Sequence, residues 1–342
     1  MNTKIKNTIE TVLPVKFINY VRLKKMKLSS FLNLLKHYHY DFRLYHKFSG
    51  ISGHTTSLNL IGEIVRRYHV IEKGLTMPQT RLGFGKDLLI SLCEVCEKFI
   101  LNYGNTDEQL VHAIGVILEY ENFHNTQHYN LDPEVISAIR KLESYTTEIK
   151  PTIQKEMTKT VFFDKKDRDF FQFSNSRSSI RNFTEEDIPL AKILNGLELI
   201  RNTPSACNRQ SWRTYVYTDK DKILKLLEIQ GGNRGFGHLA NKLIVVASEV
   251  GVFTGQEERN QAYIDGGIYL MNLVYSLHYN QIAACILNCS NSIEKDLELR
   301  KLSMIKDSEV FIAMVVCGIP PESFKIASST RYSLDMTNNF II

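Results

Sequence analysis

Long apolar runs, a disulfide framework and internal repeats are all missing from this 342-residue sequence. No apolar stretch reaches the roughly 18–20 residues that a helix needs to span a bilayer, so we expect no membrane-spanning helix. Six cysteines, mostly in apolar surroundings, predict reduced thiols and a cytoplasmic protein. The contents of 18 Gly and 8 Pro do not indicate a disordered or fibrous chain. Residues 1–21 lack a continuous apolar segment and a small-residue cleavage site, so we expect no secretory signal.

Acidic residues are scarce in the first fifty positions, where ten Lys and Arg face only Glu10 and Asp41. This arm therefore carries +8, and because the whole chain carries +5, the remainder carries −3. The favoured interpretation is an ordinary solvated helix whose apolar stripe packs on the rest of the protein. A peripheral contact of residues 1–50 with anionic lipid or a partner protein is the alternative. We expect no nucleic-acid partner.

Metal-site patterns are also absent. His37, His39 and His46 are close in sequence, but no carboxylate or cysteine pattern completes a ligand set. Cys93 and Cys96 lie inside an amphipathic helical pattern without a second cysteine pair, so we predict that they belong to the core. We expect no metal.

Two regions follow from the periodicity, a helical one at 1–160 and a second at 161–342. Helical patterns in the first region include 60–75, a segment stopping at Gly104, and one that opens with Asp132 as N-cap and Pro133 in the first turn. From Ser174 on, helices alternate with strands, which predicts an α+β domain. Expected helices are 184–202, 220–230 and 256–280, the last apolar nearly all round and therefore buried; expected strands are 213–218, 242–250, 282–289 and 309–320.

Four patches of the second region can carry chemistry. "SRSSIRNF" (176–183) combines Arg and Ser, which suits a phosphate monoester, although it also fits a polar loop that caps a helix. "NTPSACNRQSWRTYVY" (202–217) contains the single Trp of the chain and planar amides that suit a flat heterocycle, or else a buried turn. "ACILNCS" (284–290) ends an apolar strand, and Arg331 follows the last strand.

The order and spacing of these patches, over about residues 170–335, resemble the nitroreductase family of FMN-dependent oxidoreductases. The resemblance implies a nitroreductase-like FMN-binding fold at 161–342, with a central, mostly antiparallel sheet flanked by helices. It also implies a homodimer with FMN at the subunit interface. The implied cofactor-binding residues are Arg177, Ser178, Ser179, Arg181, Pro204, Ser205, Ala206, Asn208, Gln210, Ile286, Leu287, Asn288 and Arg331.

Within that resemblance, Arg177, Ser179 and Arg331 would hold the phosphate and ribityl end, and the Ile286–Asn288 backbone would lie by the flavin ring. The Pro204–Gln210 segment would come from the opposite subunit. The family usually has a basic residue where this chain has Ser178, which leaves one fewer charge for the anion.

The implied reaction is hydride transfer from NADH or NADPH through FMN to an unknown small-molecule acceptor. The cofactor carries the chemistry, so no catalytic side-chain pair is expected. The alternatives are a superfamily member that does not reduce nitro compounds (a dehalogenase, dehydrogenase or flavin-fragmenting enzyme) and a flavin-binding or interaction protein without turnover. The segment from Phe253 to Tyr263 is a hypothetical wall of the acceptor pocket.

The most distinctive segment of the helical region is "RYHVIEKGL" (67–75). His69, Glu72 and Lys73 fall at helical offsets and could share a face. One interpretation is a surface ion pair with Gly74 as C-cap. The other is a lid or partner surface over the flavin site, and the sequence leaves both open.

Overall fold

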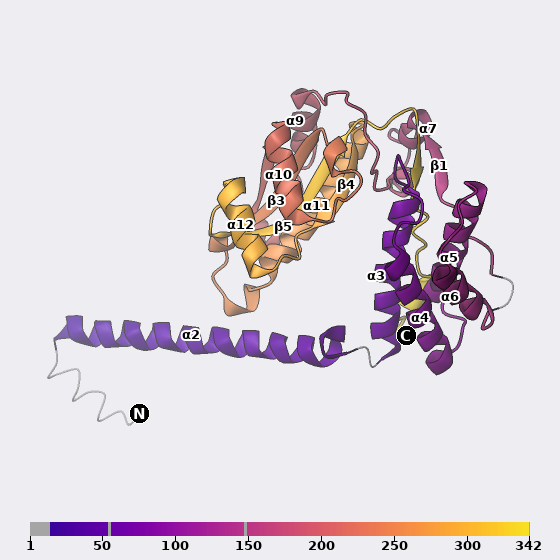
Figure 1. Cartoon of the computed structure of the whole chain (residues 1–342). Coiled ribbons are helices and arrows are strands. Elements are labelled where there is room, and N and C mark those ends of the chain that lie inside the picture. The colour runs from indigo at the N-terminus through magenta and orange to yellow at the C-terminus, as the bar shows by residue number, and fades with distance from the viewer. Residues whose placement is uncertain (1–13, 54–55, 147–148, 342) are drawn as a thin grey trace. The chain divides into compact units, whose positions relative to one another are not determined.

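The computed structural model describes residues 14–53, 56–146 and 149–341, and the chain divides into two compact units (Figure 1). The smaller unit consists of Met1–His54 and Phe253–Asn260, and the larger one of Thr55–Val252 and Gln261–Ile342. None of the described helices is long and apolar enough to cross a membrane. The predicted boundary between residues 160 and 161 stays a prediction.

In the smaller unit, the basic arm forms one helix, α2 (Val15–Phe48), followed by a 3₁₀ turn at Gly50–Ser52. No described residue of α2 is buried. Arg259, next to a second 3₁₀ turn at Gln256–Glu258, donates two hydrogen bonds of 2.6 Å to the Asp41 carboxylate. These bonds lower the pKa of Asp41. Contact of residues 1–50 with lipid or a partner stays a prediction.

The larger unit begins with a helical bundle made of α3 (Ser57–Leu75), α4 (Lys86–Tyr103), α5 (Glu108–Thr126) and α6 (Pro133–Glu143). The predicted caps are confirmed: Gly104 ends α4, and the Asp132 side chain accepts from the Glu134 N–H at the start of α6. Cys93 and Cys96 are buried in the bundle core, as predicted. Burial raises the pKa of the Cys93 thiol to about 12.

A four-stranded antiparallel sheet forms the second part, in the order β2 (Trp212–Tyr217), β3 (Lys242–Glu249), β5 (Glu309–Gly318), β4 (Ala283–Asn288). Alternate side chains of β3 enter opposite cores because strand residues point to opposite faces. One core contains α10 (Lys220–Gln230) and α12 (Ile293–Ser303), and the other contains α9 (Leu190–Leu199) and α11 (Gln261–Tyr279). The predicted α+β class with a helical N-terminal region is confirmed.

A two-stranded antiparallel ribbon pairs β1 (Lys155–Thr158) with β6 (Ser323–Ile326). Two short helices, α7 (Lys159–Phe163) and α8 (Phe170–Ser176), lead from β1 to the sheet domain. The chain after β6 contains one further turn of helix, α13 (Leu334–Thr337). The ribbon therefore joins residue 155 to the segment that carries Arg331.

The ribbon of β1 and β6 was not predicted, and further details differ from the sequence-based expectation. The helix expected from residue 184 begins only at α9, because Thr184 bonds the Ile319 carbonyl and Pro189 is the N-cap. Helix α11 is not buried all round, since Ile268 is 43% exposed and Met271 38% exposed. Helix α12 was not predicted from its strongly charged sequence.

Candidate functional site

A cavity of about 600 Å³ in the larger unit brings together part of the predicted site. The predicted residues that line it are Arg177, Ser178, Ser179, Arg181, Ile286 and Arg331. Helices α3 and α5, residues Lys155 and Asn175 and the chain segment 327–332 provide the rest of the wall. Its size lies in the range of small-molecule and cofactor sites.

The polar segment after α8 is fixed by its apolar members. The Ile180 N–H donates to the Ala284 carbonyl of β4 at 3.0 Å, and the Ile180 side chain is fully buried. Phe183 is also buried, against Gly318, where an added Cβ would come within 2.4 Å of the Phe183 ring. Anchoring of these two residues leaves Arg177 and Ser179 at the cavity wall.

Positive charge at this wall is poorly compensated. Among the described residues, Arg177 donates no hydrogen bond and forms no ion pair; burial and the charge of Arg331 both lower its pKa. Arg181 is 7% exposed, and its Nε has no hydrogen-bond partner in the described part of the chain. Unpaired buried guanidinium groups are costly, so this arrangement fits an anionic group such as a phosphate monoester.

The Ile286–Asn288 segment ends strand β4. Ile286 lines the cavity, whereas Leu287 points to the opposite face and is buried among α10 and α12. Asn288 is exposed, and its carbonyl accepts a hydrogen bond of 3.0 Å from the Gln230 side chain.

The predicted residues Pro204, Ser205, Ala206, Asn208 and Gln210 do not line this cavity. They form the connection between α9 and β2. The Ala206 N–H donates to the buried Asp265 carboxylate of α11 at 3.2 Å, and the Gln210 N–H donates to Ser205 Oγ at 3.0 Å. Asn208 and Gln210 have φ values of 55° and 48°, a left-handed conformation that costs energy in residues other than glycine.

This connection displays its amides rather than burying them. Asn208 and Gln210 are both exposed. Trp212, which begins β2, stacks on Tyr269 of α11 with ring centroids 4.8 Å apart. The tryptophan is thus a packing residue of the sheet. The side-chain amides of Asn208 and Gln210, whose backbone is left-handed, are exposed to a neighbouring molecule.

The cavity-lining residues that the site prediction missed come mainly from the helical bundle. Tyr68, His69 and Glu72 of α3 and Gln109 of α5 line the cavity together with the arginines. The distinctive segment at 67–75 was the one feature of the sequence that pointed to these residues. Its position relative to the second region could not be predicted from the sequence.

The surface-pair interpretation of that text is wrong for Glu72, which is fully buried. Gly74 is not a C-cap either, because α3 continues to Leu75 and Thr76 is the cap. An added Cβ at Gly74 would come within 2.1 Å of the Phe84 ring. Close packing of α3 on Phe84 therefore explains this glycine.

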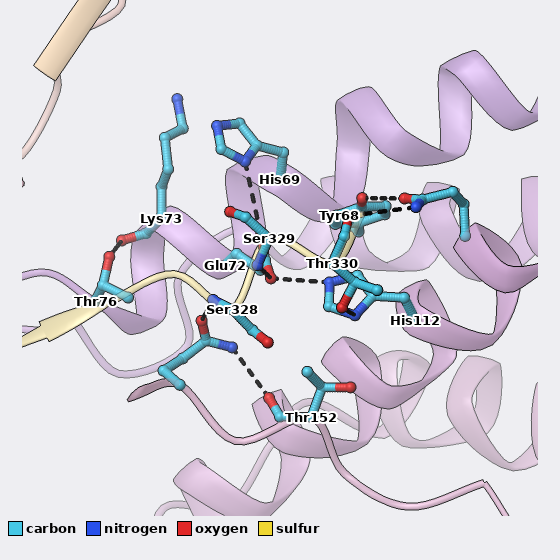
Figure 2. Close-up of polar contacts among 12 residues, drawn as sticks. Tyr68, His69, Glu72, Lys73, Thr76, His112, Thr152, Ser328, Ser329 and Thr330 are labelled. Carbon is cyan, nitrogen blue, oxygen red and sulfur yellow. Dashed lines mark hydrogen bonds and ion pairs between the residues drawn. The ribbon is translucent and has the colours of Figure 1, made fainter. Parts of the chain in front are cut away.

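Hydrogen bonds from the bundle hold the segment that carries Arg331 (Figure 2). The Ser329 N–H and His112 Nε2 both donate to Glu72 Oε1, at 3.1 and 2.9 Å. The Thr330 hydroxyl lies 2.9 Å from His112 Nδ1, and the Gln109 amide donates to the Thr330 carbonyl at 3.4 Å. The bundle thereby fixes the backbone directly before the predicted anion contact, Arg331.

Comparisons with known proteins agree with the sequence motifs. Residues 175–233 match the family model described as Nitroreductase family. No curated protein matches the chain significantly. Similar solved structures include a candidate NADH oxidase from Clostridium acetobutylicum, with 22% identity over 48% of this chain and 97% of the other and a TM-score of 0.43.

Two further similar structures are described as nitroreductases. One is an FMN-dependent nitroreductase from Clostridium difficile R20291, at 19% identity over 49% of this chain and 98% of the other, with a TM-score of 0.42. The other is a nitroreductase family protein from Streptococcus pneumoniae TIGR4, at 16% identity over 51% of this chain and all of the other, with a TM-score of 0.45.

Proposed function

Because residues 175–233 match the nitroreductase family model, we propose that this protein is an FMN-dependent oxidoreductase that takes a hydride from NADH or NADPH and reduces a small-molecule acceptor. The observation that carries the proposal is the cavity in which Arg177, Arg181 and Arg331 meet without sufficient negative charge. When bound, FMN would supply a two-electron carrier that accepts a hydride from one substrate and passes it to another.

The residues of this chain would bind and orient that cofactor. Arg177 and Arg331 would pair with the phosphate, and the Ser179 hydroxyl would bond the ribityl chain. Ser178 provides no charge, so the anion would depend on fewer cations than is usual in the family. Ile286 would offer an apolar wall to the ring.

A second copy of the chain would complete the site. Asn208 and Gln210 are exposed amides outside the cavity, and the family resemblance assigns them to the flavin of the opposite subunit. The exposed apolar stripe of α11, which includes Ile264, Ile268 and Met271, supports association between copies.

Colour is the direct test. Purified protein is expected to show the flavin absorbance bands, or to acquire them when FMN is added and excess removed. Under anaerobic conditions, NADH or NADPH is expected to bleach those bands. A colourless protein that does not retain added FMN would contradict the proposal, and a yellow protein that neither nucleotide bleaches would favour flavin binding without nicotinamide-driven turnover.

A further inference from the structure

His69 is placed differently from the other histidine of the Glu72 network. It lies on α3, its side chain is 42% exposed, and it lines the cavity that contains Arg177 and Arg331. Its Nδ1 lies 3.7 Å from Glu72 Oε2. The described residues offer its Nε2 no hydrogen-bond partner, so this nitrogen remains free for a molecule in the cavity.

Glu72 is a buried carboxylate, and only one of its two oxygens accepts hydrogen bonds in the described part of the chain. Oε1 accepts hydrogen bonds from His112 and from the Ser329 backbone (Figure 2). Oε2 is buried and has no hydrogen-bond partner among the described residues. Burial works against ionisation, but the contacts with His112, His69 and Ser329 lower the pKa of Glu72 to about 2. A buried acceptor without a donor is costly, and His69 Nδ1 lies 3.7 Å from this oxygen.

His112 shows what a purely structural histidine looks like in the same network. Both of its ring nitrogens have partners, Glu72 on one side and Thr330 on the other, and it is 5% exposed. His69 uses one nitrogen toward Glu72 and presents the other to the cavity. A carboxylate behind an imidazole fixes the tautomer in which Nδ1 carries the proton, and it stabilises the imidazolium.

We propose that His69 is a catalytic proton donor of the cavity and that Glu72 is its positioning residue. This inference rests on the proposed function. The chain's helical region, which lies outside the nitroreductase-family segment, would then contribute directly to the reduction of the acceptor.

The step balances for a quinone acceptor. NADH or NADPH loses a hydride and becomes NAD⁺ or NADP⁺. One quinone oxygen gains the hydrogen and electron pair that the hydride supplies, and the other oxygen gains a proton from Nε2 of His69. His69 then recovers its Nε2 proton from the solvent, while Nδ1 keeps its own proton on the side that faces Glu72. Lys155, which is not assigned to the phosphate, also lines this cavity and favours an acceptor that becomes anionic as it is reduced.

The test measures reoxidation of prereduced, FMN-loaded protein by a water-soluble p-benzoquinone under anaerobic conditions. His69→Asn is expected to slow this step about 100-fold, within the usual range for loss of a general acid. Added imidazole should restore part of the rate. His128→Asn, a change of an exposed histidine outside the cavity, should leave the rate unchanged.

Glu72→Gln separates positioning from proton donation. The glutamine oxygen can still accept from His112 and Ser329, but its NH₂ group would face His69 Nδ1 and favour the opposite tautomer. Reoxidation should slow in this variant. Added imidazole should not restore the rate, because the His69 side chain still fills the position that imidazole would have to enter. In proton NMR spectra of the wild type, a low-field imidazole N–H signal is expected that disappears in both His69→Asn and Glu72→Gln.

The outcomes distinguish the two proposals. FMN affinity is expected to be the same in His69→Asn and wild type. If FMN binds and His69→Asn is reoxidised at the wild-type rate, or if that variant loses FMN, the proton-donor role is overturned while the proposed function stands. Failure of the wild type to bind FMN at all would overturn the proposed function instead.

Discussion

At the scale of single residues, the candidate site depends on guanidinium groups that have too few partners. Arg177 is the clearest case, because burial and the neighbouring Arg331 both lower its pKa. A charged side chain in such a position is stabilised by an anionic ligand more than by water. Its contribution to binding can therefore be measured without knowing the acceptor.

Replacement of Arg177 by alanine is expected to weaken FMN binding about 10- to 100-fold, since one charge-assisted hydrogen bond contributes about 1.5–3 kcal/mol. Quenching of FMN fluorescence on titration with protein measures the Kd. Arg234→Ala is the matched control, because Arg234 is exposed in the connection between α10 and β3 and does not line the cavity. Equal affinities for both variants would remove the phosphate assignment.

A second residue, His278 of α11, makes stability dependent on pH. It is 2% exposed, it lies among the rings of Phe162, Phe163 and Phe173, and its Nε2 lies 2.8 Å from Ser176 Oγ. Burial, together with the charge of Arg177, lowers the pKa of His278 to about 4. The folded protein therefore holds this ring neutral where an unfolded chain protonates it.

The direction in which stability changes with pH follows from the number of protons that each state binds. Between pH 6.5 and about 4 the unfolded state binds more protons at this position, so stability is complete above pH 6.5 and falls as the pH decreases. The loss from pH 7 to pH 4 is about 3 kcal/mol. Urea unfolding at several pH values is expected to show a smaller decrease for His278→Phe than for wild type. Identical pH slopes would refute this origin, although His124, whose pKa burial also lowers, adds its own share to both proteins.

At the scale of elements, helix α3 links the two parts of the larger unit. One side of α3 enters the bundle core, and another contributes Tyr68, His69 and Glu72 to the cavity. Its glycines have opposite surroundings. Gly74 lies against the Phe84 ring, whereas a Cβ added at Gly62 would meet nothing within 4 Å.

This contrast gives a matched pair of variants within one helix. Gly74→Ala is expected to lower the free energy of unfolding by about 1–3 kcal/mol, because the new methyl group overpacks the contact with Phe84. Gly62→Ala should raise it by up to about 1 kcal/mol, since alanine favours an exposed helical position. Chemical denaturation measures both changes. A stabilised Gly74→Ala protein would show that α3 does not pack closely on Phe84.

At the scale of the whole molecule, the unanswered structural question is association. The stripe of Ile264, Ile268 and Met271 recurs at helical spacing on the exposed side of α11. The amides of Asn208 and Gln210 belong to a segment that is hydrogen-bonded to Asp265 in the second turn of the same helix. Burial of the stripe against a second copy would therefore also present those amides to a neighbour.

We predict that the FMN-loaded protein is a dimer and that Ile268→Glu converts it to a monomer with weaker flavin binding, because a carboxylate would be buried in an apolar contact. Sedimentation equilibrium measures the mass of each species. Ile293→Glu is the control, since Ile293 is 76% exposed at the start of α12, a helix of the other core. A flavin-loaded wild-type monomer would contradict the shared site.

The sequence by itself determined the classes of element and much of the chemistry. Apolar spacing, Gly104 and Asp132 located the bundle helices. One alternating segment and three continuous apolar runs located the strands of the four-stranded sheet, because these patterns are local consequences of backbone geometry. The Arg and Ser of 176–183 suited a phosphate monoester but fitted a polar capping loop as well, and the family resemblance favoured the anion site. That Arg177 and Arg331 line one cavity agrees with the family resemblance.

Only the tertiary structure decided which distant residues meet. It buried Glu72 against His112 and the Ser329 backbone, although its place in "RYHVIEKGL" was equally compatible with a surface ion pair. One side of α11 is exposed in the structure, although its apolar sequence predicted that it is buried. The physical reason is that burial and hydrogen-bond pairing are properties of contacts between elements, and neither periodicity nor composition encodes which face of a helix another segment will cover.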